Sequence, residues 1–223
     1  MTAPTTCPIA RTRIKICGFT READVDDAVA AGADALGFNL YPKSPRFVAL
    51  ARAQELIRRL PPFVTPVLLF VNASADEVRA AAAAVPHAVL QFHGDESPAS
   101  CEVAQRPYLR AVRMGAPGVS LLDFAQRFSS AQALLLDAYV DGFGGGGKVF
   151  DWSQIPPSVP LPVVLSGGLN PANVTDGVVR VRPFAVDVSS GVEVSKGVKS
   201  ADLMRRFCQA VRDADERIED APN

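Results

Sequence analysis

One of the four cysteines in this chain, Cys17, stands where a short strand-like run ends, in the segment RIKICGFT of residues 13–20. In folds that alternate strands and helices, the carboxyl end of a strand faces the ligand crevice, so a thiol there is exposed to a substrate. A free cysteine is more often a small buried apolar residue. The assignment of Cys17 to a site therefore depends on the polar residues that end the other predicted strands.

Those strand ends carry a matching set of polar side chains. They are Asn39, Lys43, Arg46, Asn72, His93, Arg113 and Asp137. Asp137 follows the run Ala-Leu-Leu-Leu, and partial desolvation at the rim of an apolar strand favours the neutral, proton-donating form of a carboxyl. His93, one of two histidines, fits a base, a donor to a ligand, or a hydrogen-bonded structural residue. We interpret Asn72 and Arg113 as turn or capping residues.

Two loops rich in glycine and serine follow the last two predicted strands. They contain Gly167 and Gly168 after the seventh strand, and Asp187, Ser189, Ser190 and Gly191 at the end of the eighth. Backbone N–H groups that approach closely at glycines, together with hydroxyls, commonly hold a phosphate in barrel folds. The pattern therefore predicts a phosphorylated substrate. The alternative is that the two glycines serve only a tight turn before the helix that starts near Pro171.

A further glycine-rich stretch, DGFGGGGK, covers residues 141–148. It does not meet the GxxxxGK[ST] spacing of a phosphate loop, because Lys148 is followed by Val149. Since glycine allows positive φ, we interpret this stretch as an active-site loop that moves over bound substrate. The alternative is a connection without a role.

Eight strand-like runs, each followed by a helical stretch, recur about every 25 residues. We predict strands at residues 13–19, 33–40, 65–71, 88–94, 108–114, 133–137, 162–168 and 184–189, and the clearest helices at 22–31, 51–60, 76–84 and 201–218. The helix after the sixth strand is reduced to residues 152–155. Eight repeats favour a closed (β/α)8 TIM barrel, formed as one domain by residues 1–223 with residues 1–12 as a short extension.

The composition narrows the class of protein. With 23 basic and 24 acidic residues the net charge is -1, so we expect no nucleic-acid partner. No segment is apolar enough for a signal peptide or a membrane span, which predicts a cytoplasmic protein with no membrane partner. The cysteines lack the spacing of a zinc site, and we expect neither a metal nor a disulfide framework. For the oligomeric state we expect a monomer or a homodimer.

Taken together, the motifs resemble those of phosphoribosylanthranilate isomerase. The segments that carry the resemblance are KICGFT, GFNLYPKSPRFV, LFVN, LQFHGDE, LLLDA, GGGGKVFDW, LSGGLNP and AVDVSSGVE, in this order over nearly all of residues 13–207. Pieces such as SGGLNP occur in several phosphate-binding barrels, but KICG with the YPKSPR loop and DVSSGVE is specific. The resemblance implies a (β/α)8 barrel that catalyses an Amadori rearrangement in tryptophan biosynthesis without a metal or organic cofactor.

The resemblance also implies roles for individual residues. Cys17 falls on the general base of the KICG motif, Asp137 on the general acid, and Arg46 on the arginine expected to meet the anthranilate carboxylate. The phosphate-binding positions fall on Gly167, Gly168, Ser189, Ser190 and Gly191. His93 and Asp187 match positions near the substrate whose roles are less defined. The chain departs from the family in its four consecutive glycines and in its N-terminal extension, which contains a second thiol, Cys7.

Two other functions are compatible with parts of this pattern. A phosphosugar isomerase of the histidine pathway resembles the chain in its phosphate loops, but would place an aspartate where Cys17 stands. A catalytically silent phosphate-binding or assembly protein would have no need of the acid–base pair Cys17 and Asp137. Loss of anthranilate fluorescence on mixing the enzyme with phosphoribosylanthranilate separates the three.

Overall fold

The computed structural model describes residues 11–116, 118–138 and 149–220. The glycine-rich stretch of residues 141–148 and the thiol Cys7 lie outside the described residues, so the expectations about them stay predictions. Within the described ranges, no helix is long and apolar enough to cross a membrane.

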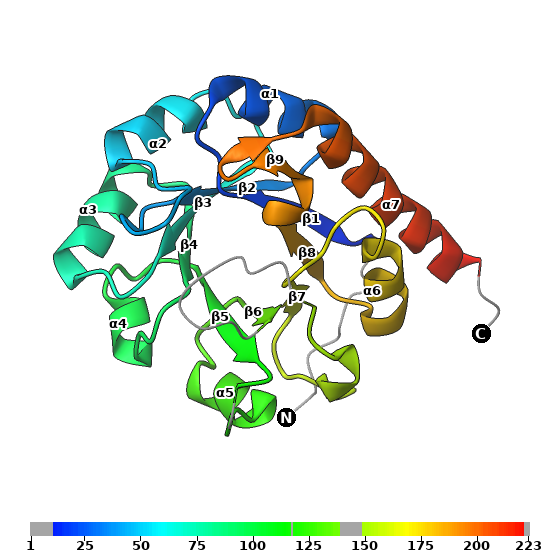
Figure 1. Cartoon of the computed structure of the whole chain (residues 1–223). Helices are drawn as coiled ribbons and strands as arrows, with labels where there is room; N and C mark the ends of the chain where they lie inside the picture. The colour runs from blue at the N-terminus through cyan, green and yellow to red at the C-terminus, as the bar shows by residue number, and fades with distance from the viewer. Residues whose placement is uncertain (1–10, 117, 139–148, 221–223) are drawn as a thin grey trace.

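Eight parallel strands close into a barrel in sequence order (Figure 1). They are β1 (Arg13–Cys17), β2 (Ala35–Asn39), β3 (Thr65–Phe70), β4 (Val89–Phe92), β5 (Tyr108–Met114), β6 (Ala133–Ala138), β7 (Val163–Leu165) and β8 (Ala185–Val188). Closure occurs where β1 pairs with β8 as well as with β2. The predicted (β/α)8 barrel is confirmed. Six of the predicted strands extended one to three residues too far at their carboxyl ends, because those last residues already belong to the loops.

Helices surround the barrel, as Figure 1 shows. They are α1 (Glu22–Ala31), α2 (Leu50–Ile57), α3 (Ala75–Ala84), α4 (Pro98–Glu102), α5 (Leu121–Arg127), α6 (Val174–Val181) and α7 (Ala201–Glu219). The reduced helix expected after β6 is the short 3-10 turn η1 (Trp152–Gln154). The capping box of Ser74 and Glu77 starts α3, and Ser200 caps α7 by accepting a hydrogen bond from the backbone of Leu203.

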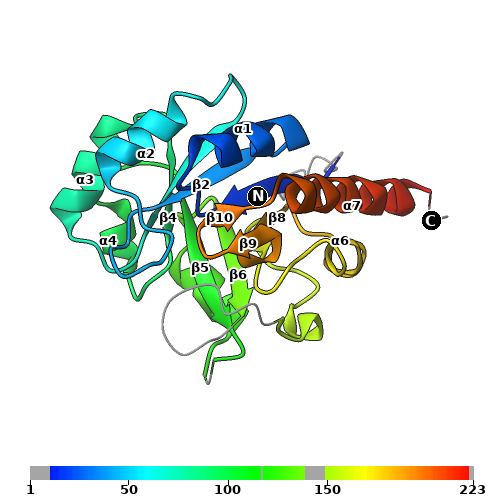
Figure 2. The same cartoon turned by 45° about the horizontal axis from the view of Figure 1, so that its top comes forward.

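The loop after β8 carries structure that the sequence pattern did not indicate. It contains the 3-10 turn η2 (Ser190–Val192) and a small antiparallel hairpin of β9 (Glu193–Ser195) and β10 (Val198–Lys199). Figure 2 shows this hairpin beside the barrel, leading into α7. Its turn is tied to the loop after β1, because Thr20 donates a hydrogen bond of 2.7 Å to the carbonyl of Gly197.

Two apolar layers build the core. The larger one lies between strands and helices and includes Phe19, Phe38, Phe92 and Phe207. The smaller one fills the barrel interior with Ala111, Ala133, Leu135, Val164 and Ala185. Side chains alternate along a strand, so every second residue faces the interior of the barrel. The interior positions nearer the carboxyl ends of the strands therefore form a separate layer. In this chain that layer is mostly polar, with Leu69 and Val71 as apolar members.

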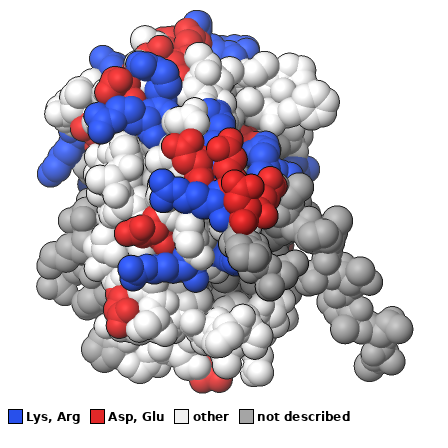
Figure 3. Space-filling model, turned by 90° about the vertical axis from the view of Figure 1, so that its right-hand side faces the viewer, with Lys and Arg blue, Asp and Glu red and all other residues white. Residues whose placement is uncertain are grey.

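The outer surface shows no separation of charge on the face seen in Figure 3, where basic and acidic side chains lie among one another. On α7, for example, Arg205 and Arg206 both lie within ion-pair distance of Asp202, at 3.5 and 3.8 Å. Surface pairs of this kind contribute little stability.

Candidate active site

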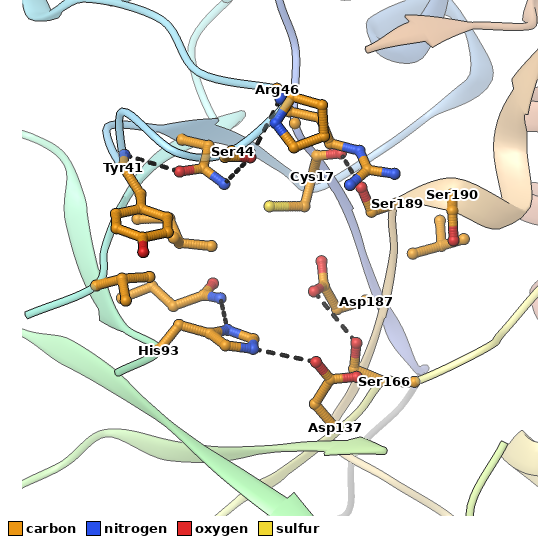
Figure 4. A pocket seen from close by; sticks show the side chains of 18 of the residues that line it. Cys17, Tyr41, Ser44, Arg46, His93, Asp137, Ser166, Asp187, Ser189 and Ser190 are labelled. Carbon is orange, nitrogen blue, oxygen red and sulfur yellow. Dashed lines mark hydrogen bonds and ion pairs between the residues drawn. The ribbon is translucent and has the colours of Figure 1, made fainter. Parts of the chain in front are cut away.

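A cavity of about 240 Å³ opens at the carboxyl ends of the strands. Nine of the ten predicted site residues line it: Cys17, Arg46, His93, Asp137, Gly167, Gly168, Asp187, Ser189 and Ser190. Figure 4 shows Cys17 and Asp137 on opposite sides of this pocket. The tenth, Gly191, does not line the cavity; it lies where the loops after β7 and β8 touch.

Cys17 ends β1, and its residue is only 6% exposed. Burial raises the pKa of its thiol above the ordinary value, since a thiolate is poorly solvated there. The ammonium groups of Lys15 and Lys199 act in the opposite direction, but burial outweighs them. The thiol is therefore protonated at rest, with two cations in place to stabilise the thiolate.

Lys15 is buried and lies two residues before Cys17, on the same face of β1. Its Nζ donates to Oδ1 of Asp187 across the β1–β8 pair at 2.7 Å, with both side chains buried. Burial alone would lower the pKa of Lys15, but the charges of Asp187 and Cys17 raise it. Asp187 is thus first of all the counter-ion of Lys15, and it also accepts a 3.4 Å hydrogen bond from the hydroxyl of Ser166.

Asp137 is the last residue but one of the apolar β6 and is bonded through both carboxyl oxygens. Oδ1 accepts from the backbone N–H of Ala138 at 2.9 Å, and Oδ2 lies 3.0 Å from Nε2 of His93. The other ring nitrogen of His93, Nδ1, lies 3.2 Å from Nε2 of Gln91. The structure thus brings the predicted residues His93 and Asp137 into direct contact and adds Gln91 on the other side of the His93 ring.

Arg46 lines the pocket, but two of its nitrogens are occupied. Its Nε and Nη2 donate to the two carboxylate oxygens of Glu193, each at 2.7 Å, so the pair is bidentate. This hydrogen bond raises the pKa of Arg46, while Arg46 and Lys199 hold the pKa of Glu193 below its ordinary value against the effect of burial. Gly18 makes room for the arginine, because a Cβ there would lie 2.5 Å from its Cδ.

Lys199 connects the pair of Arg46 and Glu193 to the backbone of Cys17. Its side chain is fully buried, and its Nζ donates to the carbonyl of Cys17 at 2.6 Å, the carbonyl of Ser189 at 3.1 Å and Glu193 at 2.9 Å. Burial lowers the pKa of Lys199. The ammonium group of Lys199 therefore anchors the β9–β10 hairpin to the carbonyl at the end of β1 and to the loop after β8, and its third hydrogen bond stays within the hairpin.

The two glycine–serine loops approach each other closely. Gly167 and Gly168 have φ of +78° and +66°, conformations that glycine adopts without strain. A Cβ on Gly191 would lie 1.9 Å from the carbonyl oxygen of Leu169, so only glycine allows this contact. The hydroxyl of Ser189 donates to the carbonyl of Cys17 at 3.0 Å, which leaves its backbone N–H rather than its hydroxyl for a ligand.

An apolar wall completes the pocket. Cys17, Leu69 and Val71 pack together with Tyr41, and all four line the cavity. Among the described residues, no group of three or more acidic, histidine or cysteine side chains gathers in a way that could hold a metal ion. The arrangement offers a thiol, a carboxyl, a guanidinium and an apolar surface in one pocket.

Among the charged and amide side chains that bond to the predicted site residues, sequence reasoning missed four: Lys15, Gln91, Glu193 and Lys199. Two of them carried a signal, because Lys15 and Gln91 precede Cys17 and His93 by two residues and so share their faces. Glu193 and Lys199 lie in the unpredicted hairpin. Their partners are distant in sequence, and no local pattern specifies them.

Comparison with known proteins agrees with this geometry. The family model described as "N-(5'phosphoribosyl)anthranilate (PRA) isomerase" matches residues 14–210. A relative from Leptothrix cholodnii, named N-(5'-phosphoribosyl)anthranilate isomerase, is 70% identical over 212 residues, which is 95% of this chain and 96% of the relative.

Solved structures show the same correspondence. A phosphoribosyl anthranilate isomerase from Thermus thermophilus superposes with a TM-score of 0.82 at 35% identity, covering 91% of this chain and 99% of that one. Another, solved with reduced 1-(o-carboxyphenylamino)-1-deoxyribulose 5-phosphate, has a TM-score of 0.75 at 34% identity, covering 91% of this chain and 99% of that one. The chain belongs to the phosphoribosylanthranilate isomerase family.

Proposed function

We propose that this chain catalyses the Amadori rearrangement of N-(5-phosphoribosyl)anthranilate to 1-(o-carboxyphenylamino)-1-deoxyribulose 5-phosphate in tryptophan biosynthesis, with Asp137 as general acid and Cys17 as general base. The observation that carries the assignment is the placement of a carboxyl and a thiol on opposite sides of one pocket (Figure 4). The reaction needs two proton transfers at different atoms of the sugar, which suits two separated groups.

The first transfer opens the ring. Asp137 gives its proton to the ribose ring oxygen as the bond from C1 to that oxygen breaks, and the anthranilate nitrogen forms a Schiff base with C1. Cys17, as thiolate, then removes the proton from C2. The C2–H electron pair forms a C1–C2 double bond, and the pair of the C1–N double bond moves to the nitrogen to give an enolamine. The enolamine tautomerises to the ketose product. Asp137 ends without its proton and Cys17 with one, so solvent exchange restores the pair.

The thiolate requires help, because burial favours the thiol. Lys15 and Lys199 supply the positive charge. Lys15 occupies the neighbouring interior position of β1, and Lys199 belongs to the β9–β10 hairpin. A cation beside a cysteine stabilises the ionised form. We propose that these two lysines hold the thiolate during the second transfer.

Arg46 is proposed to bind the anthranilate carboxylate. Glu193 occupies the edge formed by Nε and Nη2, which leaves the edge that includes Nη1 for the substrate. A guanidinium carries five N–H donors and can bind two carboxylates on different edges. The apolar wall of Tyr41, Leu69 and Val71 would then receive the aromatic ring.

The phosphate is proposed to bind at the loops after β7 and β8. Gly167, Gly168 and Ser190 line the cavity at that side, and Gly191 permits the two loops to meet. Glycines in positive φ present their backbone N–H groups to an anion without interference from a side chain. The phosphorylated ligand of the solved relative supports this part of the proposal.

The direct test is loss of anthranilate fluorescence when the purified protein is added to freshly made phosphoribosylanthranilate. We expect turnover by the unsubstituted enzyme and strongly reduced turnover by Asp137→Asn at similar substrate affinity, because the amide is nearly isosteric but cannot donate the proton. A fully active Asp137→Asn variant with an unchanged pH profile would exclude Asp137 as the acid.

The cytoplasmic location and the monomeric or homodimeric state remain proposals for this chain. Analytical ultracentrifugation of the full chain over a range of concentrations would decide the second. A single species of higher order than a dimer would contradict it.

A further inference from the structure

Gln91 is the one polar side chain of β4 that has no part in the mechanism above. It lies two residues before His93, on the same face of the strand, and it lines the pocket with its residue fully buried. Its amide nitrogen lies 3.2 Å from Nδ1 of His93, and Nε2 of the same ring lies 3.0 Å from Oδ2 of Asp137. The three side chains thus form a line that ends on the proposed acid.

The orientation of the Gln91 amide in the structure specifies a tautomer of His93. With the amide nitrogen facing the ring, Gln91 donates the hydrogen bond, and Nδ1 accepts it and carries no proton. A neutral ring then has its proton on Nε2 and donates it to Oδ2 of Asp137. Since Oδ1 accepts from the backbone N–H of Ala138 at 2.9 Å, each oxygen of the carboxylate meets one fixed donor.

We propose that Gln91 is a positioning residue that fixes this tautomer of His93, so that a prearranged donor receives the negative charge that develops on Asp137. This inference rests on the proposed role of Asp137 as the acid. The proton that moves passes from the carboxyl of Asp137 to the ribose ring oxygen, while His93 keeps its Nε2 proton throughout. Donors aimed at developing charge stabilise a transition state more than a ground state.

The opposite tautomer would have the opposite effect. With the proton on Nδ1, the ring would present a lone pair at Nε2 to Asp137. The carboxyl proton would then bond to His93 instead of passing to the substrate. Gln91 thus determines whether His93 assists or opposes proton donation, although it touches neither Asp137 nor the proton.

The burial of Gln91 supports a role beyond folding. Its Oε1 has no hydrogen-bond partner within the described part of the chain. Its register neighbours on β3 and β5 are Leu69 and Leu109, which are apolar. A buried amide with an unpaired acceptor destabilises a fold relative to an apolar side chain of similar size. Folding alone would therefore favour methionine or leucine at this position.

The tautomer can be measured directly. The chain contains only two histidines, and the second, His87, is exposed, so a long-range ¹H–¹⁵N spectrum of the labelled enzyme shows two rings that the His87→Gln control assigns. We expect His93 to show a bare Nδ1 and a protonated Nε2, and the Gln91→Met variant to shift its ring toward the Nδ1-protonated form. A protonated Nδ1 in the unsubstituted enzyme, or an unchanged ring in Gln91→Met, would overturn the proposal.

Kinetics provide the second readout. We expect Gln91→Met to lower kcat about tenfold, the equivalent of one hydrogen bond, with KM and Tm unchanged or Tm raised. His93→Leu should lose roughly 10²-fold in kcat, whereas His93→Gln should retain more activity because its amide can replace the Nε2 donor. A raised KM, a lowered Tm and an unchanged kcat in Gln91→Met would indicate a purely structural residue.

The outcomes also separate this inference from the proposed function. Full activity of Asp137→Asn would remove the acid assignment, whatever the tautomer of His93. Loss of activity in Asp137→Asn together with full activity in Gln91→Met would overturn only the positioning role.

Discussion

At the scale of single residues, Cys17 is subject to two opposing influences. Burial favours the thiol, and the ammonium groups of Lys15 and Lys199 favour the thiolate. Because burial is the larger effect, the pKa of Cys17 is raised, and the acid limb of kcat/KM that it sets should lie above the ordinary thiol value of ~8.5. Thiolate absorbance of the Cys7→Ser variant, with and without Cys17→Ser, measures the same titration. A midpoint well below the ordinary value would contradict the assignment of burial as the dominant cause.

Replacing the thiol tests its role in turnover. We expect Cys17→Ser to keep the fold and the substrate affinity but to lower kcat by roughly 10²–10⁴, the range for a positioned proton-transfer group. Circular dichroism and KM serve as the checks on fold and affinity. Near-normal turnover of Cys17→Ser, together with strongly impaired turnover of Cys7→Ser, would show that Cys7 and not Cys17 is the catalytic thiol.

The proposed role of Arg46 is better tested by a lysine than by an alanine substitution. In Arg46→Ala, Glu193 would lose one of its two counter-ions, which would disturb the site for a second reason. Arg46→Lys keeps a positive charge near Glu193 but loses the planar fork. We expect it to weaken binding of an aryl-carboxylate product analogue about tenfold or more, with little change in binding of inorganic phosphate. Ser190→Asp, which places a negative charge beside the proposed phosphate site, should weaken both in calorimetric titration. Equal loss of phosphate binding in the two variants would reverse the proposed orientation of the substrate.

At the scale of elements, regular repeats were predictable and the irregular loop was not. The helix predicted at residues 201–218 is α7 (Ala201–Glu219), since its apolar spacing continues over five turns. The β9–β10 hairpin was missed because its strands have three and two residues and no alternation. The sequence therefore indicated Cys17, His93 and Asp137 at strand ends, but not Glu193 and Lys199, whose positions depend on contacts across the barrel mouth.

The contact between the loops after β7 and β8 leads to a prediction about backbone fit. Gly191→Ala should force Leu169 and its loop away, since the added Cβ would lie 1.9 Å from a backbone oxygen. We expect a loss of ~1–3 kcal/mol in the free energy of unfolding, as in other overpacked sites, and at least tenfold weaker binding of inorganic phosphate.

Gly115→Ala is the matched control for this substitution. Gly115 has nothing within 4 Å of its added Cβ and a φ of +85°, so only backbone strain of roughly 1–2 kcal/mol is expected, with phosphate binding unchanged. Unchanged phosphate affinity in Gly191→Ala would show that the contact between the two loops does not shape the phosphate site.

At the scale of the whole molecule, the barrel keeps its apolar layer and its polar layer apart along one axis. Interior positions far from the pocket are apolar, whereas Lys15, Gln91 and Asp187 occupy buried interior positions close to it. These polar groups are expensive to bury and are paired with one another or with the site residues. Stability therefore depends mainly on the layer between strands and helices, which also contains two thiols, Cys101 and Cys208.

These two thiols predict how the stability of the molecule changes at alkaline pH. Burial raises the pKa of Cys101 to about 12 and that of Cys208 to about 11, whereas an unfolded thiol ionises near ~8.5. Above ~8.5 the unfolded chain has lost protons that the folded chain keeps, so each thiol lowers the free energy of unfolding by roughly 1.4 kcal/mol per pH unit until the pH reaches its folded pKa. Below ~8.5 the contribution is complete and constant.

We therefore expect the free energy of unfolding, measured in urea, to fall between about pH 8.5 and 9.5. The fall should be less steep in Cys208→Ala, by at most roughly 1.4 kcal/mol per pH unit, because one thiol no longer contributes. The variant should start from a lower stability, because a fully buried side chain is shortened. Cys7→Ser serves as the control for thiol chemistry as such. If Cys208→Ala and the unsubstituted chain lose stability with the same slope, Cys208 does not remain protonated in the folded state and its burial in the layer between α7 and the barrel is wrong.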